Sequence, residues 1–170
     1  MSDDLIRVPT GLTTDGLIGR RYLARIIDTV ILALLAGTVI LLLAVVMQPI
    51  GHWFRLLLSL SVLLVIWIAY GALLESSPWQ ATLGKRCTGL RVYNSAGGRL
   101  TMAQAASRGL VKDGPFFLVS GLPFGNVLSL VWIGCHLVVL HRSPVYQAIH
   151  DKAAKTWVAS PEGTTQLHLT

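Results

Sequence analysis

The chain has 170 residues, of which 53% are hydrophobic and only 13% are charged, and its mean hydropathy is +0.62. Because a soluble domain carries about 25% charged residues, this composition excludes an ordinary soluble protein and predicts an integral membrane protein. The net charge of +6 does not indicate nucleic-acid binding, since the basic residues cluster beside apolar stretches, where membrane topology and anionic lipid headgroups account for them.

The N-terminal part of the chain predicts a tail followed by a long apolar helix. Residues 1–19 are polar, with Gly, Thr and Asp, and we expect them to form a flexible cytoplasmic tail. The 22 residues from Ile26 to Met47 contain a single charge. At about 1.5 Å per residue they form a helix of roughly 33 Å, which is enough to cross a bilayer core of about 30 Å.

The single charge in this helix is Asp28. A charged side chain inside a bilayer costs about 2.5–3.5 kcal/mol or more unless it is paired or hydrated. Arg25 and Arg21 precede Asp28 by three and seven residues, so all three lie on the same face of the helix. Two interpretations stay open: an ion pair that anchors the helix at the interface, or a polar site for an ion, a proton or a substrate.

A second transmembrane helix is predicted from Leu56 to Leu74, which carry no charge, and Glu75 ends it. In the polar segment that follows, apolar and polar residues alternate over 90–93, and the Ser, Ala and Gly residues at 95–98 are typical of a turn. We therefore expect a small β-hairpin outside the bilayer, with residues 99–101 as its second strand.

The third apolar region is interrupted. Thr101 is a suitable N-cap for a helix over residues 102–112, and the Gly114-Pro115 pair is expected to interrupt or kink that helix. The apolar runs that follow are too short to cross a membrane separately, so they form either one kinked crossing or a helical hairpin. We favour the hairpin, because it leaves only Arg55, one of fourteen Lys and Arg residues, outside the cell.

The fold class that follows is an all-α membrane protein. It is a helical bundle of about four transmembrane or half-membrane helices with a small cytoplasmic β-hairpin, and both termini are cytoplasmic. Residues 156–158 are expected to form a short strand beside the hairpin, and residues 159–170 a flexible tail.

No pattern in the sequence indicates catalysis. We find no nucleophile–base pattern, no metal-ligand cluster and no glycine loop for a nucleotide, so we expect no enzyme activity, no cofactor and no metal site. Asp151 is expected to neutralise a basic residue such as Arg21 or Arg108 and so to clamp the C-terminal segment to the first helix. Lys112 and Asp113 are expected to form an interfacial pair.

Several of these residues carry a resemblance to a known family. Arg21 before the first span, Asp28 within it and Asp151 near the end resemble the three signature residues of the RDD family of prokaryotic membrane proteins. The Ala-Thr-Leu-Gly-Lys-Arg sequence of residues 81–86 also looks like the loop of that family after its second span. The resemblance covers about residues 20–158, which we take as the membrane domain. One departure is Gln80, which stands where a glycine is frequent.

The candidate site is a charge site for an ion or proton, or a structural one, formed by Arg21, Arg25, Asp28 and Asp151. Its supporting polar residues are Thr82, Gly84, Lys85, Arg108 and His150. The resemblance implies a multi-pass protein of the inner membrane, and cation–proton exchange has been proposed for some members of the family.

Two functions follow as alternatives. The first is a small transporter or transport subunit, with Asp28 exchanging a proton for a small cation. The second is a non-catalytic membrane scaffold or assembly partner whose buried Arg and Asp residues are structural. Four short helices can hardly enclose a pathway alone, so we expect the protein to form a homo-oligomer or to bind a membrane partner in the lipid bilayer.

Overall fold

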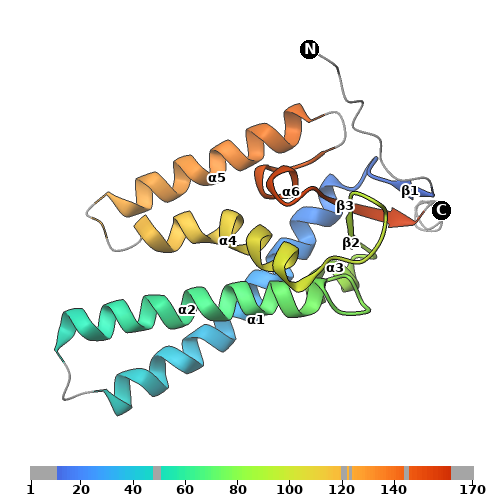
Figure 1. Cartoon of the computed structure of the whole chain (residues 1–170). Coiled ribbons are helices and arrows are strands. Elements are labelled where there is room, and N and C mark those ends of the chain that lie inside the picture. The colour runs from blue at the N-terminus through green and yellow to red at the C-terminus, as the bar shows by residue number, and fades with distance from the viewer. Residues whose placement is uncertain (1–10, 48–50, 120–121, 123, 144–145, 162–170) are drawn as a thin grey trace.

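The computed structural model describes residues 11–47, 51–119, 122, 124–143 and 146–161. Within these residues the helices are α1 (Ile18–Val46), α2 (His52–Glu75), α3 (Leu83–Cys87), α4 (Met102–Val119), α5 (Gly125–Arg142) and α6 (Ile149–Ala153), and the strands are β1 (Leu12–Thr13), β2 (Arg91–Asn94) and β3 (Thr156–Pro161). Figure 1 shows the long helices forming a bundle, with the strands and the short helices α3 and α6 gathered at one end. We call this the sheet end.

Among the described residues, α1, α2 and α5 are long and apolar enough to cross a membrane. Helix α1 begins at Ile18 rather than at Ile26, so Arg21 and Arg25 lie inside the helix. The apolar run marks only the part of α1 that can lie in the hydrocarbon core. The helix itself begins before that run, because a helix satisfies its backbone hydrogen bonds within its own segment whatever side chains it carries.

The third apolar region forms two helices that run back along each other (Figure 1). The expected N-cap is confirmed: the Gln104 amide donates to the Thr101 hydroxyl at 3.2 Å, and the Thr101 amide donates to the Gln104 side chain at 3.1 Å. Helix α4 does not end at Pro115 but continues to Val119. Proline removes one backbone hydrogen bond, a loss that membrane helices tolerate when neighbouring groups compensate.

The expected β-hairpin is wrong. Strand β2 pairs antiparallel with β3, not with residues 99–101, and β1 pairs with the other edge of β3, so the sheet has three strands in the order β1–β3–β2. The turn after β2 is held by the Asn94 side chain, which accepts from the amides of Ala96 (2.9 Å) and Gly98 (2.8 Å). Leu100 is then buried in the core and does not extend a strand.

The sheet also shortens both expected tails. Strand β1 lies within residues 1–19, and β3 continues past residue 158, where the C-terminal tail was expected to begin, with Ala159 and Ser160 fully buried. The other residues assigned to the tails, 1–10 and 162–170, lie outside the described part of the chain.

A small apolar core lies beneath the sheet. It joins the start of α1, the end of α2, the start of α4 and the two longer strands, and its members are Leu17, Ala24, Ala72, Leu90, Val92, Leu100, Ala105 and Val158. Large apolar side chains elsewhere on α1, α2 and α5 are mostly exposed, as expected of helices that face lipid. The core therefore fixes the sheet end, and the charged residues there are held in place by it.

Gln80 turns the chain between α2 and α3. Its φ of +53° lies in the left-handed region, which glycine adopts without strain. The turn is stabilised by two backbone hydrogen bonds, from Gln80 to the Ser77 carbonyl at 3.0 Å and from Val92 to the Gln80 carbonyl at 2.7 Å. Gln80 therefore has a left-handed backbone conformation, and this conformation explains why glycine suits the position.

Candidate functional site

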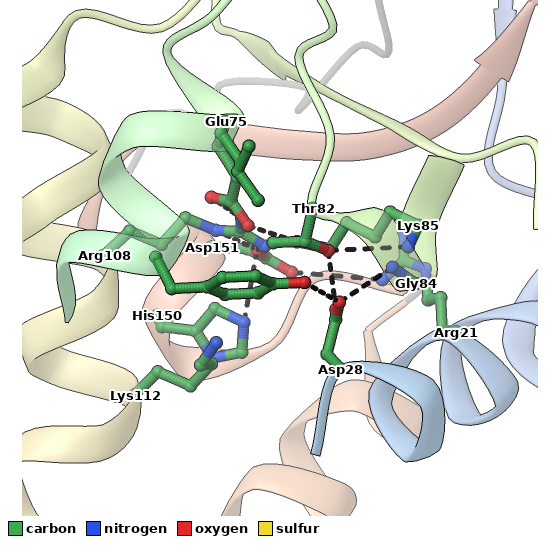
Figure 2. Close-up of polar contacts among 12 residues, drawn as sticks. Arg21, Asp28, Glu75, Thr82, Gly84, Lys85, Arg108, Lys112, His150 and Asp151 are labelled. Carbon is green, nitrogen blue, oxygen red and sulfur yellow. Dashed lines mark hydrogen bonds and ion pairs between the residues drawn. The ribbon is translucent and has the colours of Figure 1, made fainter. Parts of the chain in front are cut away.

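Asp28 is a buried carboxylate with three hydrogen-bond donors. The hydroxyls of Tyr70 (2.7 Å) and Thr82 (2.5 Å) and the amide of Gly84 (2.8 Å) all donate to it, and Figure 2 shows the bonds from Thr82 and Gly84. Within the described residues no ion pair joins Asp28 to Arg25 or Arg21, the two arginines that share its helix face. Neutral donors on α2 and at the start of α3 take the place of the expected arginine partners.

The local sequence Thr-Leu-Gly explains how α3 reaches Asp28. Thr82 is the N-cap of α3, accepting from the Lys85 amide and donating to Asp28 with the same hydroxyl. Gly84 packs against α1 so closely that a Cβ added there would overlap the Ala24 carbonyl oxygen and lie 2.9 Å from the Asp28 carboxyl. Only glycine permits this approach, so Asp28 fixes the loop after α2 against α1.

A chain of ion pairs crosses the sheet end. The Lys85 ammonium pairs with Glu75, whose other oxygen accepts from Arg108 at 2.5 Å. Arg108 also donates to Asp151 through Nε (2.9 Å) and Nη2 (2.5 Å). Arg108, Glu75 and Asp151 are each at most 3% exposed. This chain links α3, α2, α4 and α6 and is shown in Figure 2.

Arg21 meets the other side of Asp151. Its Nη1 lies 3.9 Å from Asp151 Oδ2, and its two terminal nitrogens donate to the backbone carbonyls of Tyr146 and Val158. The expected pairing of Asp151 with Arg21 or Arg108 is therefore present with both arginines. The clamp joins α1 to the C-terminal segment, as predicted.

A second cluster of charges joins α1 to α4. Arg25 donates to Asp113 Oδ1 at 2.8 Å, and the Lys112 ammonium lies 3.2 Å from Asp113 Oδ2. The expected Lys112–Asp113 pair is present, and Arg25 is its additional partner. Arg25 thus points to α4, whereas Arg21 points to α6.

Burial and neighbouring charges shift the pKa values of this cluster. Burial raises the pKa of the Asp151 carboxyl, but the charge of Arg108, aided by that of Arg21, outweighs burial and holds this pKa below its usual range. Burial lowers the pKa of Lys85 to about 8, against the opposing charge of Glu75. Lys85 therefore exchanges its proton closer to neutral pH than a free lysine does.

His150 is neutral at physiological pH. Burial lowers its pKa well below the usual range; the Asp151 charge opposes this shift, and the charges of Arg108 and Lys112 reinforce it. Its Nε2 lies 3.5 Å from Asp151 Oδ1, and its ring stacks on that of His136 at 5.3 Å between centroids. His136 in turn contacts the Trp132 carbonyl at 3.2 Å through Nδ1.

These charges surround a cavity of about 420 Å³ between α1, α4, α5 and α6. Its lining includes five basic residues and two carboxylates, namely Arg21, Arg25, Lys85, Arg108, Lys112, Asp28 and Asp151. The apolar part of the lining comes mainly from α5. All four members of the candidate charge site line the cavity, together with Lys85, Arg108 and His150. Thr82 and Gly84 are not part of the lining; they donate hydrogen bonds to Asp28.

Comparison with protein families decides the membership of the chain. The model of the RDD family matches residues 16–155. The chain belongs to the RDD family, a prokaryotic membrane protein family. Searches of the curated proteins and of the solved structures found no match.

In this RDD protein the three residues of the resemblance lie around one cavity. Arg21 and Asp151 are joined at 3.9 Å, and Asp28 lines the same space from the next turns of α1. Arg21 and Asp151 are far apart in the sequence, so their contact depends on α6 folding back onto α1.

Sequence reasoning missed three functional groups. Glu75 ends the second predicted span, and its position directly before a basic loop is the signal that could have indicated its pairs with Lys85 and Arg108. Tyr70 lies within the second predicted span, where its hydroxyl needs a hydrogen-bond partner, but nothing in the sequence identifies that partner as Asp28. Asp113 was assigned to Lys112 alone, because its contact with Arg25 depends on how α4 crosses α1.

No metal centre is indicated by the described part of the chain, where no group of three or more His, Cys, Asp or Glu residues is arranged to hold an ion.

Proposed function

We propose that this RDD protein is a small transport protein, or a subunit of one, in which the charged cavity at the sheet end holds the solute. A single observation carries the proposal: an apolar helical bundle keeps seven charged side chains around one cavity. Ionisable groups near a bilayer are costly, and where they face a common space they usually mark the pathway of an ion or substrate.

The proposed protein lies in the inner membrane with both termini in the cytoplasm. Support comes from the short elements and helix ends at the sheet end, which carry most of the basic residues that the structure describes, since basic segments stay on the cytoplasmic side. The cavity then faces the cytoplasm, and a full pathway requires a second conformation, a second copy or another membrane protein. No enzyme activity and no cofactor belong to this proposal.

Cation–proton exchange through Asp28 is the specific form of the proposal that we would test first. Asp28 lines the cavity, and a carboxylate is the group that can exchange a proton for a cation. Asp28→Asn is a suitable variant, because an amide oxygen still accepts from Tyr70 and Gly84 and the amide nitrogen can donate to Thr82. The variant therefore removes the charge while keeping the hydrogen bonds.

The test uses purified protein in liposomes that contain a pH-sensitive dye. A gradient of each of a series of cations is imposed, and proton movement is recorded for the wild type, Asp28→Asn and the control Asp15→Asn, whose side chain is exposed in the chain before α1. We expect flux from the wild type and the control and none from Asp28→Asn. Wild-type flux from a folded Asp28→Asn protein would exclude Asp28 as the coupling group.

A second candidate function is a membrane scaffold whose charges are structural. The observation that favours it is the saturation of Asp28 by three neutral donors, which leaves little of its carboxylate for an ion. Under this alternative no cation gradient moves protons through the wild type. The same liposome experiment therefore separates the two functions.

A homo-oligomer is part of the transport proposal. The long faces of α1, α2 and α5 are mostly exposed in one copy of the chain, and four helices leave little room for an enclosed pathway. Light scattering of the protein in detergent is expected to give a mass above that of one chain. A mass of one chain under conditions that support flux would remove the oligomer from the proposal.

A further inference from the structure

We propose that the cavity at the sheet end binds a phosphate group, carried either by a soluble phosphate ester or by a phospholipid headgroup. Lys112, Arg25 and Arg21 are its cationic partners. This inference rests on the proposed function in taking the cavity as the solute site, but it assigns that site an anion in place of the cation of the exchange through Asp28. It concerns binding and can be tested without any measurement of flux.

The balance of charge around the cavity favours an anion. Five basic side chains line it but only two carboxylates do. Two further carboxylates, Glu75 and Asp113, pair with the basic residues without lining the cavity themselves. Even with these included, four carboxylates stand against five cations, so the set keeps an excess of positive charge.

The carboxylates that line the cavity are already engaged. Asp28 accepts from three donors. Asp151 accepts twice from Arg108 through Oδ1, while its Oδ2 accepts from the Ala148 amide at 3.2 Å and lies 3.9 Å from Arg21. A cation would have to displace these donors to find oxygen ligands, so the cavity is poorly prepared for one.

The basic residues, in contrast, keep donors for a ligand. Arg21 Nε is buried and has no hydrogen-bond partner within the described residues. Arg25 uses Nη2 for Asp113, yet its side chain is 46% exposed. Lys112 lies 3.2 Å from Asp113 Oδ2, but this oxygen receives no aligned hydrogen bond within the described residues. A phosphate group, with several acceptor oxygens, suits such a set of donors.

The apolar wall indicates that the phosphate is part of a larger molecule. Besides the basic residues, Trp132, Ile133, Leu137 and Leu140 of α5 line the cavity. Apolar walls with a few convergent charged groups are typical of sites that bury an organic ligand and hold its polar end. A phosphate ester with an apolar part matches both walls, and a phospholipid is one such molecule.

The test measures binding by titration to the purified protein in a sugar-based detergent, which carries no phosphate, with the unfolding midpoint followed by tryptophan fluorescence. One arm adds inorganic phosphate. A second arm adds phosphatidylglycerol to the detergent micelles, and a third adds sodium or potassium chloride. Ligands that bind only the folded protein raise the midpoint. A rise with phosphate assigns a soluble ester as the source, and a rise with phosphatidylglycerol alone assigns a lipid headgroup.

Variants at two neighbouring positions are expected to change the affinity for the probe in opposite directions. Lys112→Gln removes a cation and is expected to weaken binding of the active probe about tenfold, the effect of losing one charge-assisted hydrogen bond. Asp113→Asn removes the competing carboxylate and is expected to strengthen binding. Lys152→Gln, an exposed position on α6 outside the cavity lining, is the matched control and is expected to behave as the wild type.

Several results would overturn the inference. These are no midpoint shift with either phosphate probe, a shift of equal size in Lys112→Gln, or a shift with salt cations that Asp113→Asn weakens. Binding with the expected variant pattern but without flux would leave the inference intact and remove the transport proposal. Flux without phosphate binding would do the reverse.

Discussion

Arg108 is the residue on which the sheet end depends most directly. Its guanidinium is buried and joins Glu75 of α2 to Asp151 of α6, while it belongs itself to α4. A buried charge is stable only when it is paired, so the loss of one partner leaves a large uncompensated cost. Asp151 is the more informative partner to change, because it also faces Arg21.

Asp151→Asn is expected to lower the stability of the protein by about 3–5 kcal/mol, the usual cost of breaking a buried ion pair. The substitution leaves Arg108 with Glu75 alone and Arg21 without a nearby carboxylate. The measurement is the unfolding midpoint of the purified variant in detergent, with Asp15→Asn as the exposed control. An unchanged midpoint for Asp151→Asn would show that the clamp does not stabilise the fold.

His150 gives the stability a pH dependence that begins near neutral pH. Because burial lowers its folded pKa, the unfolded chain binds a proton below about pH 6.5 that the folded chain does not bind. Stability therefore falls as the pH drops below about 6.5, by up to about 1.4 kcal/mol per pH unit. The facing groups are Asp151, Arg108, Lys112 and His136, and the depressed pKa of Asp151 adds a loss only below about pH 4.

The measurement for His150 is the unfolding midpoint in detergent between about pH 7 and about pH 5. His150→Gln is expected to flatten the profile, and His52→Gln, an exposed position at the start of α2, is expected to leave it as in the wild type. A wild-type slope in His150→Gln would assign the acid sensitivity to another group.

At this scale the sequence predicted the partners of Asp151 but not those of Asp28. The pairing of Asp151 could be predicted from charge, because a carboxylate beside the membrane needs a basic partner and Arg21 and Arg108 are expected on the same side of the membrane. Asp28 lies on the same helix face as two arginines, yet these arginines contact α4 and α6 instead. Spacing along one helix shows which residues share a face, but tertiary contacts decide which of them pair.

At the scale of elements, α3 is held to α1 by a close approach of backbone that only glycine allows. Gly84→Ala is expected to cost about 1–3 kcal/mol, the usual range for overpacking, because the new Cβ would overlap the Ala24 carbonyl and crowd Asp28. The measurement is the unfolding midpoint in detergent. Gly71→Ala, in α2 with no atom near its added Cβ, is the matched control.

The expected outcome for Gly71→Ala is unchanged or slightly higher stability, since alanine favours helix by up to about 1 kcal/mol over glycine. Equal midpoints for the two variants would mean that α3 can move away from α1 without cost, and that Asp28 does not fix the loop.

The long helices could be predicted from apolar runs, whereas the short elements could not. Helices α1 and α2 each contain an apolar run whose length fits the bilayer, so composition was sufficient for them. The expectation that the apolar runs of the third region are too short to cross separately is wrong for α5, because the helix extends beyond its apolar run and is then long enough to span. Helices α3 and α6 have five residues each and no such signal. The pairing of β2 with β3 joins segments far apart in the chain, and local turn residues therefore indicated the wrong partner.

For the whole molecule, the arrangement of the two helical hairpins bears on the membrane topology. The end of α1 and the start of α2 lie on the same side of the bundle as the end of α4 and the start of α5, opposite the sheet (Figure 1). If the sheet end is cytoplasmic, both hairpin turns face the outside. Helix α4 is not among the three candidate spans of the described residues. It nevertheless runs away from the sheet end, and α5 brings the chain back beside it (Figure 1).

Cysteine labelling in intact cells tests this topology. In a background without Cys87 and Cys135, single cysteines replace His52 or Phe124 at the hairpin turns, and Ser95 or Lys152 at the sheet end; all four positions are exposed. We expect an impermeant thiol reagent to label His52→Cys and Phe124→Cys and to label the other two only after the membrane is permeabilised, because basic segments are retained in the cytoplasm. Labelling of Lys152→Cys but not of Ser95→Cys in intact cells would show a single crossing after Lys112. The segment that contains Lys152 would then lie on the opposite side of the membrane from the segment that contains Ser95. Since Arg21 and Asp151 are 3.9 Å apart, that result would also be incompatible with the clamp.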